Sequence, residues 1–166
     1  MLARLLWRQS TDLAGYRKAK QQLINVYTNM LQEAASQARA LKLAYPDEPH
    51  IVKLIERSLQ DHIRVVQEFN ELSITANLLS GKSDHSGMLK VMEWRDRAMA
   101  SNLVWLATEV YPEETIIVWG HNGHISKAQS SITNMPKSMG ELMPTEWKRR
   151  GYVLGLFMAG GESVTQ

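Results

Sequence analysis

The chain has 166 residues, of which 44% are hydrophobic and 22% charged, with 19 lysines and arginines against 17 aspartates and glutamates. This composition is typical of one globular domain and excludes a disordered chain. The basic residues are scattered, so no nucleic-acid partner is expected. Because the chain contains no cysteine, disulfides, thiolate metal sites and a cysteine nucleophile are excluded.

Neither end of the chain predicts a membrane segment. The start, MLARLLWRQS, holds too short an apolar run for a signal peptide, and YVLGLFMAGG near the end is shorter than the roughly 20 residues of a membrane span. We therefore expect a cytoplasmic protein with no membrane partner.

Two long helices are predicted first. Apolar residues recur at helical spacing from Leu13 to Leu41 and again from Ile51 to Leu79, and the two prolines of YPDEP, residues 45–49, mark a turn between them. His62 falls on the apolar stripe of the second helix and is expected in the core. Residues 1–87 are therefore assigned to a helical hairpin region.

A third helix is predicted from Met88 to Val110, after a loop at Ser80 to Gly87 and before Pro112. That loop contains His85 beside Ser83 and Asp84, but catalytic triads are assembled from residues distant in sequence, so this triplet is discounted.

Beyond the third helix the pattern changes from helical to strand-like. TIIVW, Thr115 to Trp119, is short and rich in β-branched residues, and Tyr152 to Met158 predicts a second strand, with a short helix near Pro144 between them. The fold class expected is an α/β fragment, predominantly helical, with three long helices followed by strand, loop, helix and strand. Residues 88–166 would form part of an α/β domain, which the family resemblance described below implies to be hydrolytic.

Two strands do not make a stable sheet by themselves, since each strand needs neighbours on its edges. We therefore expect one incomplete domain whose sheet is completed by a second copy of the chain, as a homodimer, or by a missing N-terminal portion.

Two histidines follow the first predicted strand. In GHNGH, His121 and His124 flank Asn122-Gly123, a pair favoured in tight turns with positive φ, so the two imidazoles are expected to share one small volume. Imidazole titrates near neutral pH and can act as a general acid or base. From the spacing alone, a catalytic site and a solvated turn are equally compatible with this pattern.

The third helix supplies two further candidates. Arg95 and Asn102 are seven residues apart, two turns along one face, and both fall on its apolar stripe. A guanidinium on an apolar face needs a partner or a polar cavity, so Arg95 is a site candidate, and a structural ion pair is the alternative.

No cofactor is expected. A zinc protease motif places two histidines four residues apart on a helix with a glutamate between them, whereas the spacing here is three and the intervening residues are Asn and Gly. A metal is therefore not predicted, although a histidine-based metal or haem site is kept as a further alternative.

EWRDRAMASNLVWL, residues 93–106, followed by IIVWGHNGHISK, residues 116–127, resembles the erythromycin esterase family, in which an Arg-Asp/Glu, Met-Ala, Asn, Trp helix precedes a strand that ends in Trp-x-His-Asn-x-His. SMGELM, residues 138–143, is similar to the segment that follows. The Gly-Glu-x-x-His-Gly segment of that family, which supplies the histidine held to be the general base, has no counterpart here, so we expect a C-terminal portion of such a protein.

The resemblance implies hydrolysis of an ester or lactone bond by a histidine-assisted water, without a metal or a covalent serine. Arg95, His121 and His124 match family positions lining the cleft and are the expected catalytic residues; Asn102 and Asn122 match motif positions and are assigned to substrate binding. The partner would be a small-molecule ester or lactone, but neither a macrolide substrate nor antibiotic resistance follows from the resemblance. The alternative is a non-catalytic helical interaction or small-ligand-binding module completed by dimerisation.

Overall fold

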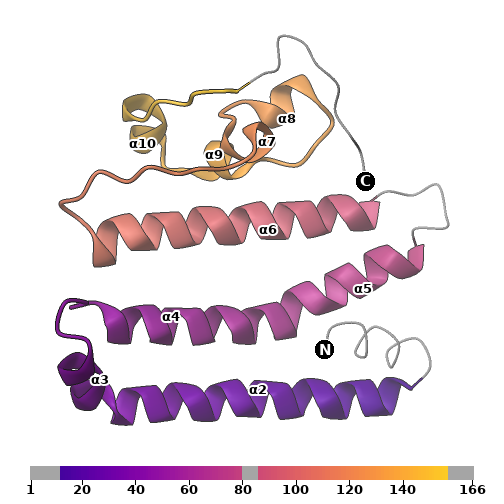
Figure 1. Cartoon of the computed structure of the whole chain (residues 1–166). Coiled ribbons are helices and arrows are strands. Elements are labelled where there is room, and N and C mark those ends of the chain that lie inside the picture. The colour runs from indigo at the N-terminus through magenta and orange to yellow at the C-terminus, as the bar shows by residue number, and fades with distance from the viewer. Residues whose placement is uncertain (1–11, 80–85, 157–166) are drawn as a thin grey trace. The chain divides into compact units, whose positions relative to one another are not determined.

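The computed structural model describes residues 12–79 and 86–156, and Figure 1 shows its helices. The chain divides into two compact units, Met1–Val91 and Met92–Gln166, which are described in turn. The predicted loop at 80–87 lies largely outside the described residues, as do His85 and its two polar neighbours.

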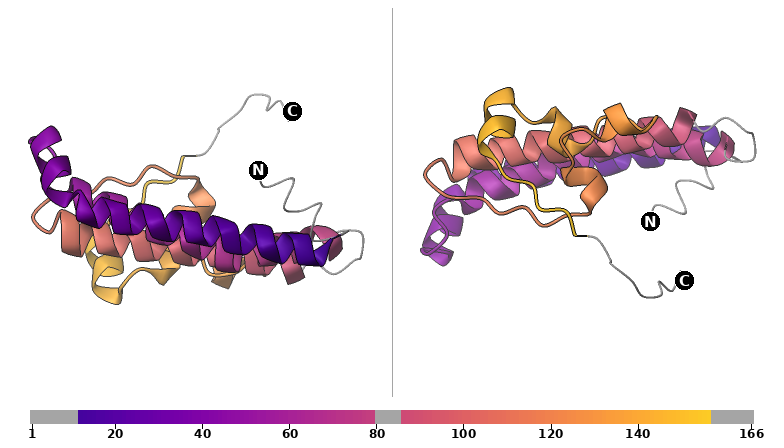
Figure 2. Two further views of the ribbon diagram at one scale, coloured as in Figure 1. Left: turned by 90° about the horizontal axis from the view of Figure 1, so that it is seen from below. Right: turned by 90° about the horizontal axis from the view of Figure 1, so that it is seen from above.

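The first unit is the predicted helical hairpin. Its elements are α2 (Leu13–Ser36), α3 (Ala38–Ala44), α4 (Ile51–Arg64), the π-helical turn η1 (Val65–Phe69) and α5 (Asn70–Leu79). Asp12 caps α2 by accepting a hydrogen bond from the Gly15 amide at 2.8 Å, as short acidic side chains do at helix starts. Figures 1 and 2 show α2 running antiparallel to α4 and its continuation through η1 into α5. The single helix expected over 13–41 is interrupted at Gln37.

In this unit α2 packs most extensively against α4, and a buried cluster joins α2 to α5. Tyr16 and Ile74 are each 2% exposed, and Ala19 and Leu23 pack against them. At the edge of the core, Lys20 donates hydrogen bonds to the Gln67 carbonyl at 2.9 Å and to the Glu71 carboxylate at 2.5 Å. Burial of apolar side chains along one stripe of each helix thus holds the hairpin together.

His62 does not lie in the core. Its side chain is exposed, its Nδ1 lies 2.6 Å from the Ser58 carbonyl oxygen, and its ring centroid is 5.2 Å from that of Tyr27. The expectation of a core position is therefore wrong, because a histidine with a polar partner one turn back and an aromatic neighbour can remain at the surface.

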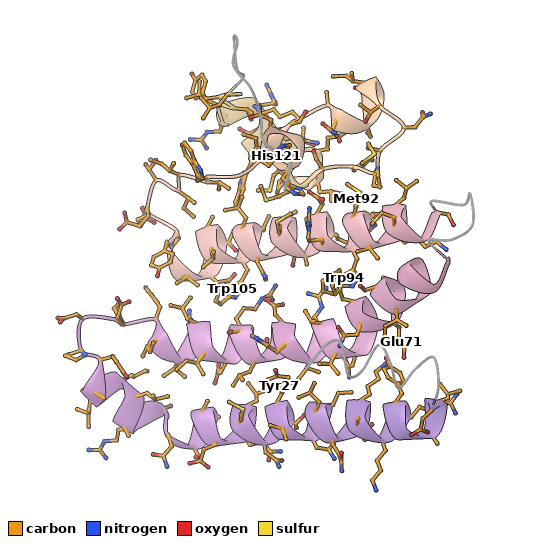
Figure 3. The ribbon with its side chains drawn as sticks, turned by 45° about the vertical axis from the view of Figure 1, so that its right-hand side comes forward. Tyr27, Glu71, Met92, Trp94, Trp105 and His121 are labelled. Carbon is orange, nitrogen blue, oxygen red and sulfur yellow. The ribbon has the colours of Figure 1, made fainter. Side chains whose placement is uncertain are left out.

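The second unit is built on α6 (Ser86–Trp105), of which the residues from Met92 onward belong to it, and on the turn η2 (Leu106–Val110). Up to residue 156, where the description ends, four short helices follow: α7 (Asn122–Ile125), α8 (Gln129–Ile132), α9 (Met139–Leu142) and α10 (Thr145–Arg150). Figure 3 shows Met92 and His121 on one side of α6 and Trp94 and Trp105 on the other. Among the described helices, none combines the length and the apolar character needed to cross a membrane.

The predicted strands do not form. Over residues 12–79 and 86–156 no residue is in a strand, and the segments 115–120 and 151–156 have no regular secondary structure. The exposed fraction is 87% for Ile117, 86% for Trp119 and 98% for Tyr152. The α/β fold class with strand, loop, helix and strand is therefore wrong, whereas the predominantly helical character is confirmed.

The physical reason is that β-branched sequence favours extended backbone, but a strand exists only when a neighbouring strand accepts and donates its ladder hydrogen bonds. Residues 157 and 158 of the second predicted strand lie outside the described part of the chain. The proposed division at residue 87 stays a prediction.

Candidate functional site

The two histidines sit in one helical turn. His121 is the N-cap of α7, and its Nδ1 accepts a hydrogen bond from the Gly123 amide at 3.1 Å. The His124 amide donates to the His121 carbonyl at 2.9 Å, so these are the first and fourth residues of a turn, as predicted. The ring centroids are 6.4 Å apart and the rings meet edge to face (Figure 3 labels His121). The two imidazoles therefore do share one small volume.

The turn is helical, however, and Gly123 does not adopt the expected positive φ. A Cβ atom at this position would lie 3.3 Å from Nδ1 of His121. A larger residue here would thus make a tight contact with the imidazole, which lies close over the backbone, and the backbone itself is not left-handed.

Two consecutive residues of α6 reach opposite nitrogens of one imidazole. Arg95 Nη2 lies 2.6 Å from His124 Nε2, and Asp96 Oδ1 lies 2.8 Å from His124 Nδ1. The exposed fraction of the side chain is 25% for His124 and 7% for Asp96. The structure therefore brings Arg95 and His124 together, as expected for one site.

Arg95 was expected to face inward from the apolar stripe of this helix, and the structure differs. Arg95 is exposed, whereas Asp96 is buried. Asp96 was not among the predicted site residues. Its signal in the sequence was the Arg-Asp/Glu pair of the family-like motif, since consecutive residues on a helix point about 100° apart and only one of the pair can face inward.

The start of α9 provides a second hydrogen bond to the Asp96 carboxylate. The Met139 amide donates to Asp96 Oδ1 at 2.8 Å, and Ser138 donates from Oγ to the Ser126 carbonyl at 2.6 Å. Met139 and Gly140 are buried, and a Cβ atom on Gly140 would overlap the carbonyl oxygens of Ile125 and Ser126. The first turn of α9 is therefore packed directly against the end of α7.

Glu141 organises this junction. It completes a capping box with Ser138, and its carboxylate accepts hydrogen bonds from Oγ and the amide of Ser130 at 2.5 and 3.0 Å. Burial raises the pKa of Glu141, but the hydrogen bonds from Ser130 and Ser138 outweigh it, so the pKa is lower than usual for a glutamate. The carboxylate thus links α8 to α9 in its charged form.

The two asparagines have different positions. Asn122 donates from Nδ2 to the Leu156 carbonyl at 2.7 Å and accepts the Leu156 amide at 3.1 Å, which ties the segment 151–156 to α7. Asn102 is half-buried two turns along α6 from Arg95. Assignment of either residue to substrate binding stays a prediction.

Donor and acceptor chemistry fixes the proton positions on both rings. A guanidinium can only donate, so His124 Nε2 accepts from Arg95, and in the neutral ring the proton is on Nδ1, where it is donated to Asp96. Because His121 Nδ1 accepts from the Gly123 amide, the neutral ring carries its proton on Nε2. His121 thus offers an N–H donor, and Arg95 of α6 offers a positive charge beside the same turn through its contact with His124.

The described residues contain no cluster of three or more histidine, aspartate or glutamate side chains that could hold a metal ion. Arg95 and Asp96 instead each hydrogen-bond to the His124 ring. The positive charge of Arg95 and the Nε2–H of His121 are the groups that can bind an oxygen that carries or develops negative charge.

Comparison with known proteins places this chain in a family. The chain matches the Erythromycin esterase family over residues 3–166, and it belongs to that family. It is 28% identical over 161 residues to the Bacillus subtilis (strain 168) protein named "Putative hydrolase YbfO". The aligned segment covers 93% of this chain and 35% of that protein. The chain thus spans about a third of the length of this relative. No solved structure matches it.

Proposed function

We propose that this chain carries part of the active site of a hydrolase that cleaves an ester or lactone bond by attack of water. One observation carries the proposal: Arg95 and His124 are 29 residues apart in sequence, yet Nη2 of Arg95 lies 2.6 Å from Nε2 of His124. Family membership and the name of the Bacillus subtilis relative support the same class of reaction.

The roles follow from the hydrogen-bonding groups. Arg95 is exposed and supplies a permanent positive charge that stabilises the oxygen anion formed when water attacks the ester carbonyl. His121 is exposed as well, and its Nε2–H orients the water or polarises the carbonyl oxygen. His124 holds the guanidinium through Nε2.

Water must also lose a proton. Both imidazole lone pairs are engaged, one by Arg95 and one by the Gly123 amide. We therefore assign the general base to a residue other than these two histidines, in keeping with the histidine of the Gly-Glu-x-x-His-Gly segment that the family resemblance implies and that has no counterpart in this sequence.

The test is hydrolysis of p-nitrophenyl acetate and p-nitrophenyl butyrate, measured on this chain and on the protein encoded by the complete reading frame that contains it. We expect hydrolysis above the buffer rate in the latter, lost when Arg95 is replaced by leucine. Arg97→Leu is the matched control, because Arg97 lies on the same helix and pairs with Glu93 at 2.6 Å. Absence of hydrolysis, or equal loss in both variants, would overturn the proposal.

A second candidate function is an interaction module, favoured by the exposed apolar side chains of 115–120 and 151–156. Ile117, Trp119, Tyr152 and Leu154 are each more than four-fifths exposed, and large exposed apolar side chains mark surfaces that another chain covers. We propose that a second copy or the rest of a longer chain covers them. Light scattering tests this function: a stable dimer without esterase activity supports it, and a monomer that remains dispersed opposes it.

A further inference from the structure

Asp96 is the most buried charged group at the site. Its residue exposure is 5%, and a carboxylate removed from water is stable only when its oxygens are hydrogen-bonded. One oxygen, Oδ1, accepts from two directions: from His124 Nδ1 and from the Met139 amide, each at 2.8 Å. The carboxylate is therefore fixed by α7 and α9 while it projects from α6.

The two hydrogen bonds to His124 depend on the same choice, namely which ring nitrogen carries the proton. A neutral imidazole has one donor nitrogen and one acceptor nitrogen. If the proton moved from Nδ1 to Nε2, Nδ1 would present a lone pair to the Asp96 oxygen, and Nε2–H would face the Arg95 guanidinium. Both contacts would then become repulsive, so the acceptor at Asp96 and the donor at Arg95 select the same tautomer.

We propose that Asp96 is a positioning residue that keeps the His124 proton on Nδ1, so that Nε2 remains the acceptor that aims the Arg95 guanidinium. His124 is then the holder of Arg95 rather than the base that activates water. The proposal deepens and rests on the proposed function, but its structural part, the tautomer of one ring, is measurable without any substrate.

The arrangement also explains why the carboxylate must be buried between two helices. A surface carboxylate would exchange its imidazole partner for water, because exposed ion pairs contribute little. The Met139 amide donates a second hydrogen bond to the same Oδ1, and the Ser138 hydrogen bond to Ser126 holds α9 against the end of α7. Displacement of α9 would therefore loosen the ring that aims Arg95.

The experiment is nitrogen-15 NMR of the histidine rings in the labelled chain, with His124 assigned by the signal missing from His124→Gln. We expect the Nδ1–H tautomer in the unchanged chain, a reduced fraction of it in Asp96→Ala, where only the exposed Arg95 still selects it, and its retention in Asp96→Asn, since the amide oxygen can still accept from both His124 and Met139. Glu93→Ala removes a carboxylate from the exposed side of the same helix and should leave the tautomer unchanged.

An Nε2–H tautomer or an imidazolium at neutral pH in the unchanged chain would overturn the proposal, even if Asp96→Ala failed to fold. An unaltered tautomer in a folded Asp96→Ala would do the same. In the active protein we expect Asp96→Ala to lower kcat by at least about tenfold with a smaller change in KM, and Asp96→Asn, whose amide oxygen can keep both hydrogen bonds, to recover most of it. Failure of ester hydrolysis with the tautomer as expected would instead overturn the proposed function alone.

Discussion

Asp96 and His124 are 28 residues apart in the chain and are joined by a hydrogen bond of 2.8 Å between Oδ1 and Nδ1. This bond connects α6 to the histidine turn, and Arg95 closes on the other nitrogen of the same ring. One imidazole therefore holds a face of α6 and the histidine turn together.

Replacement of either histidine of the turn should impair hydrolysis. We expect His121→Ala and His124→Ala each to lower kcat/KM by at least about 100-fold, because the first removes an N–H donor and the second releases Arg95. The measurement is steady-state hydrolysis of p-nitrophenyl butyrate by the active protein. A loss smaller than roughly threefold in both variants would indicate a turn with a structural role only.

Gly140→Ala should destabilise the second unit. The added methyl group would overlap the carbonyl oxygens of Ile125 and Ser126, and we expect a cost of about 1–3 kcal/mol, as for other insertions into close-packed positions. Gly120→Ala is the matched control, since its Cβ would meet only the Ile125 side chain at an ordinary 3.4 Å. Urea unfolding measures both; equal midpoints would contradict the tight seating of α9.

Glu141 should make stability depend on acid. The pKa of Glu141 is lowered in the folded state. The contribution of its carboxylate to the free energy of unfolding is therefore fully present above the unfolded pKa of about 4.3 and is lost as the pH falls through the folded pKa. We expect the difference in unfolding free energy between the unchanged chain and Glu141→Gln to shrink between about pH 7 and about pH 3. Ser130→Ala removes one of the hydrogen bonds and should weaken this dependence. A difference that does not vary with pH would contradict the prediction.

Tyr16→Phe should not destabilise the hairpin. Among the described residues the buried Tyr16 hydroxyl has no hydrogen-bond partner, so its removal should be neutral or stabilise by up to about 2 kcal/mol. Burial first, and the Glu71 charge second, raise the pKa of Tyr16. Above the unfolded pKa of about 10 the unfolded chain ionises Tyr16 more readily than the folded chain does. The stability that comes with the neutral tyrosine is therefore present below that pKa and is lost as the pH rises through the folded pKa. Urea unfolding should show the advantage of phenylalanine growing in that alkaline range, and a clear loss at neutral pH would refute the expectation.

Asn122→Asp should release the segment 151–156. Aspartate keeps an acceptor for the Leu156 amide but cannot donate to the Leu156 carbonyl, which Asn122 Nδ2 does at 2.7 Å. We expect faster amide hydrogen exchange at Leu156 in Asn122→Asp and faster still in Asn122→Ala. If exchange were unchanged while KM for the ester rose, Asn122 would have the substrate-binding role predicted from sequence rather than this structural one.

The helical hairpin could be predicted from the sequence because its determinant is local. Apolar residues at helical spacing and the turn with two prolines at 45–49 specify two amphipathic helices whose stripes must be buried against each other. The prediction of strands failed for the opposite reason. The β-branched run at 115–119 records a preference for extended backbone, but ladder hydrogen bonds depend on neighbours that the run does not specify.

The sequence by itself determined the residue types of the candidate site: two histidines one turn apart, and an Arg-Asp pair on the preceding helix. Only the tertiary structure decided which member of that pair is buried and which is exposed, and it is Asp96 that lies inside. The physical reason is that burial depends on what packs against the helix. The Met139 amide at the start of α9 satisfies the Asp96 carboxylate, and this contact lies 43 residues away in the chain, beyond the reach of helical periodicity.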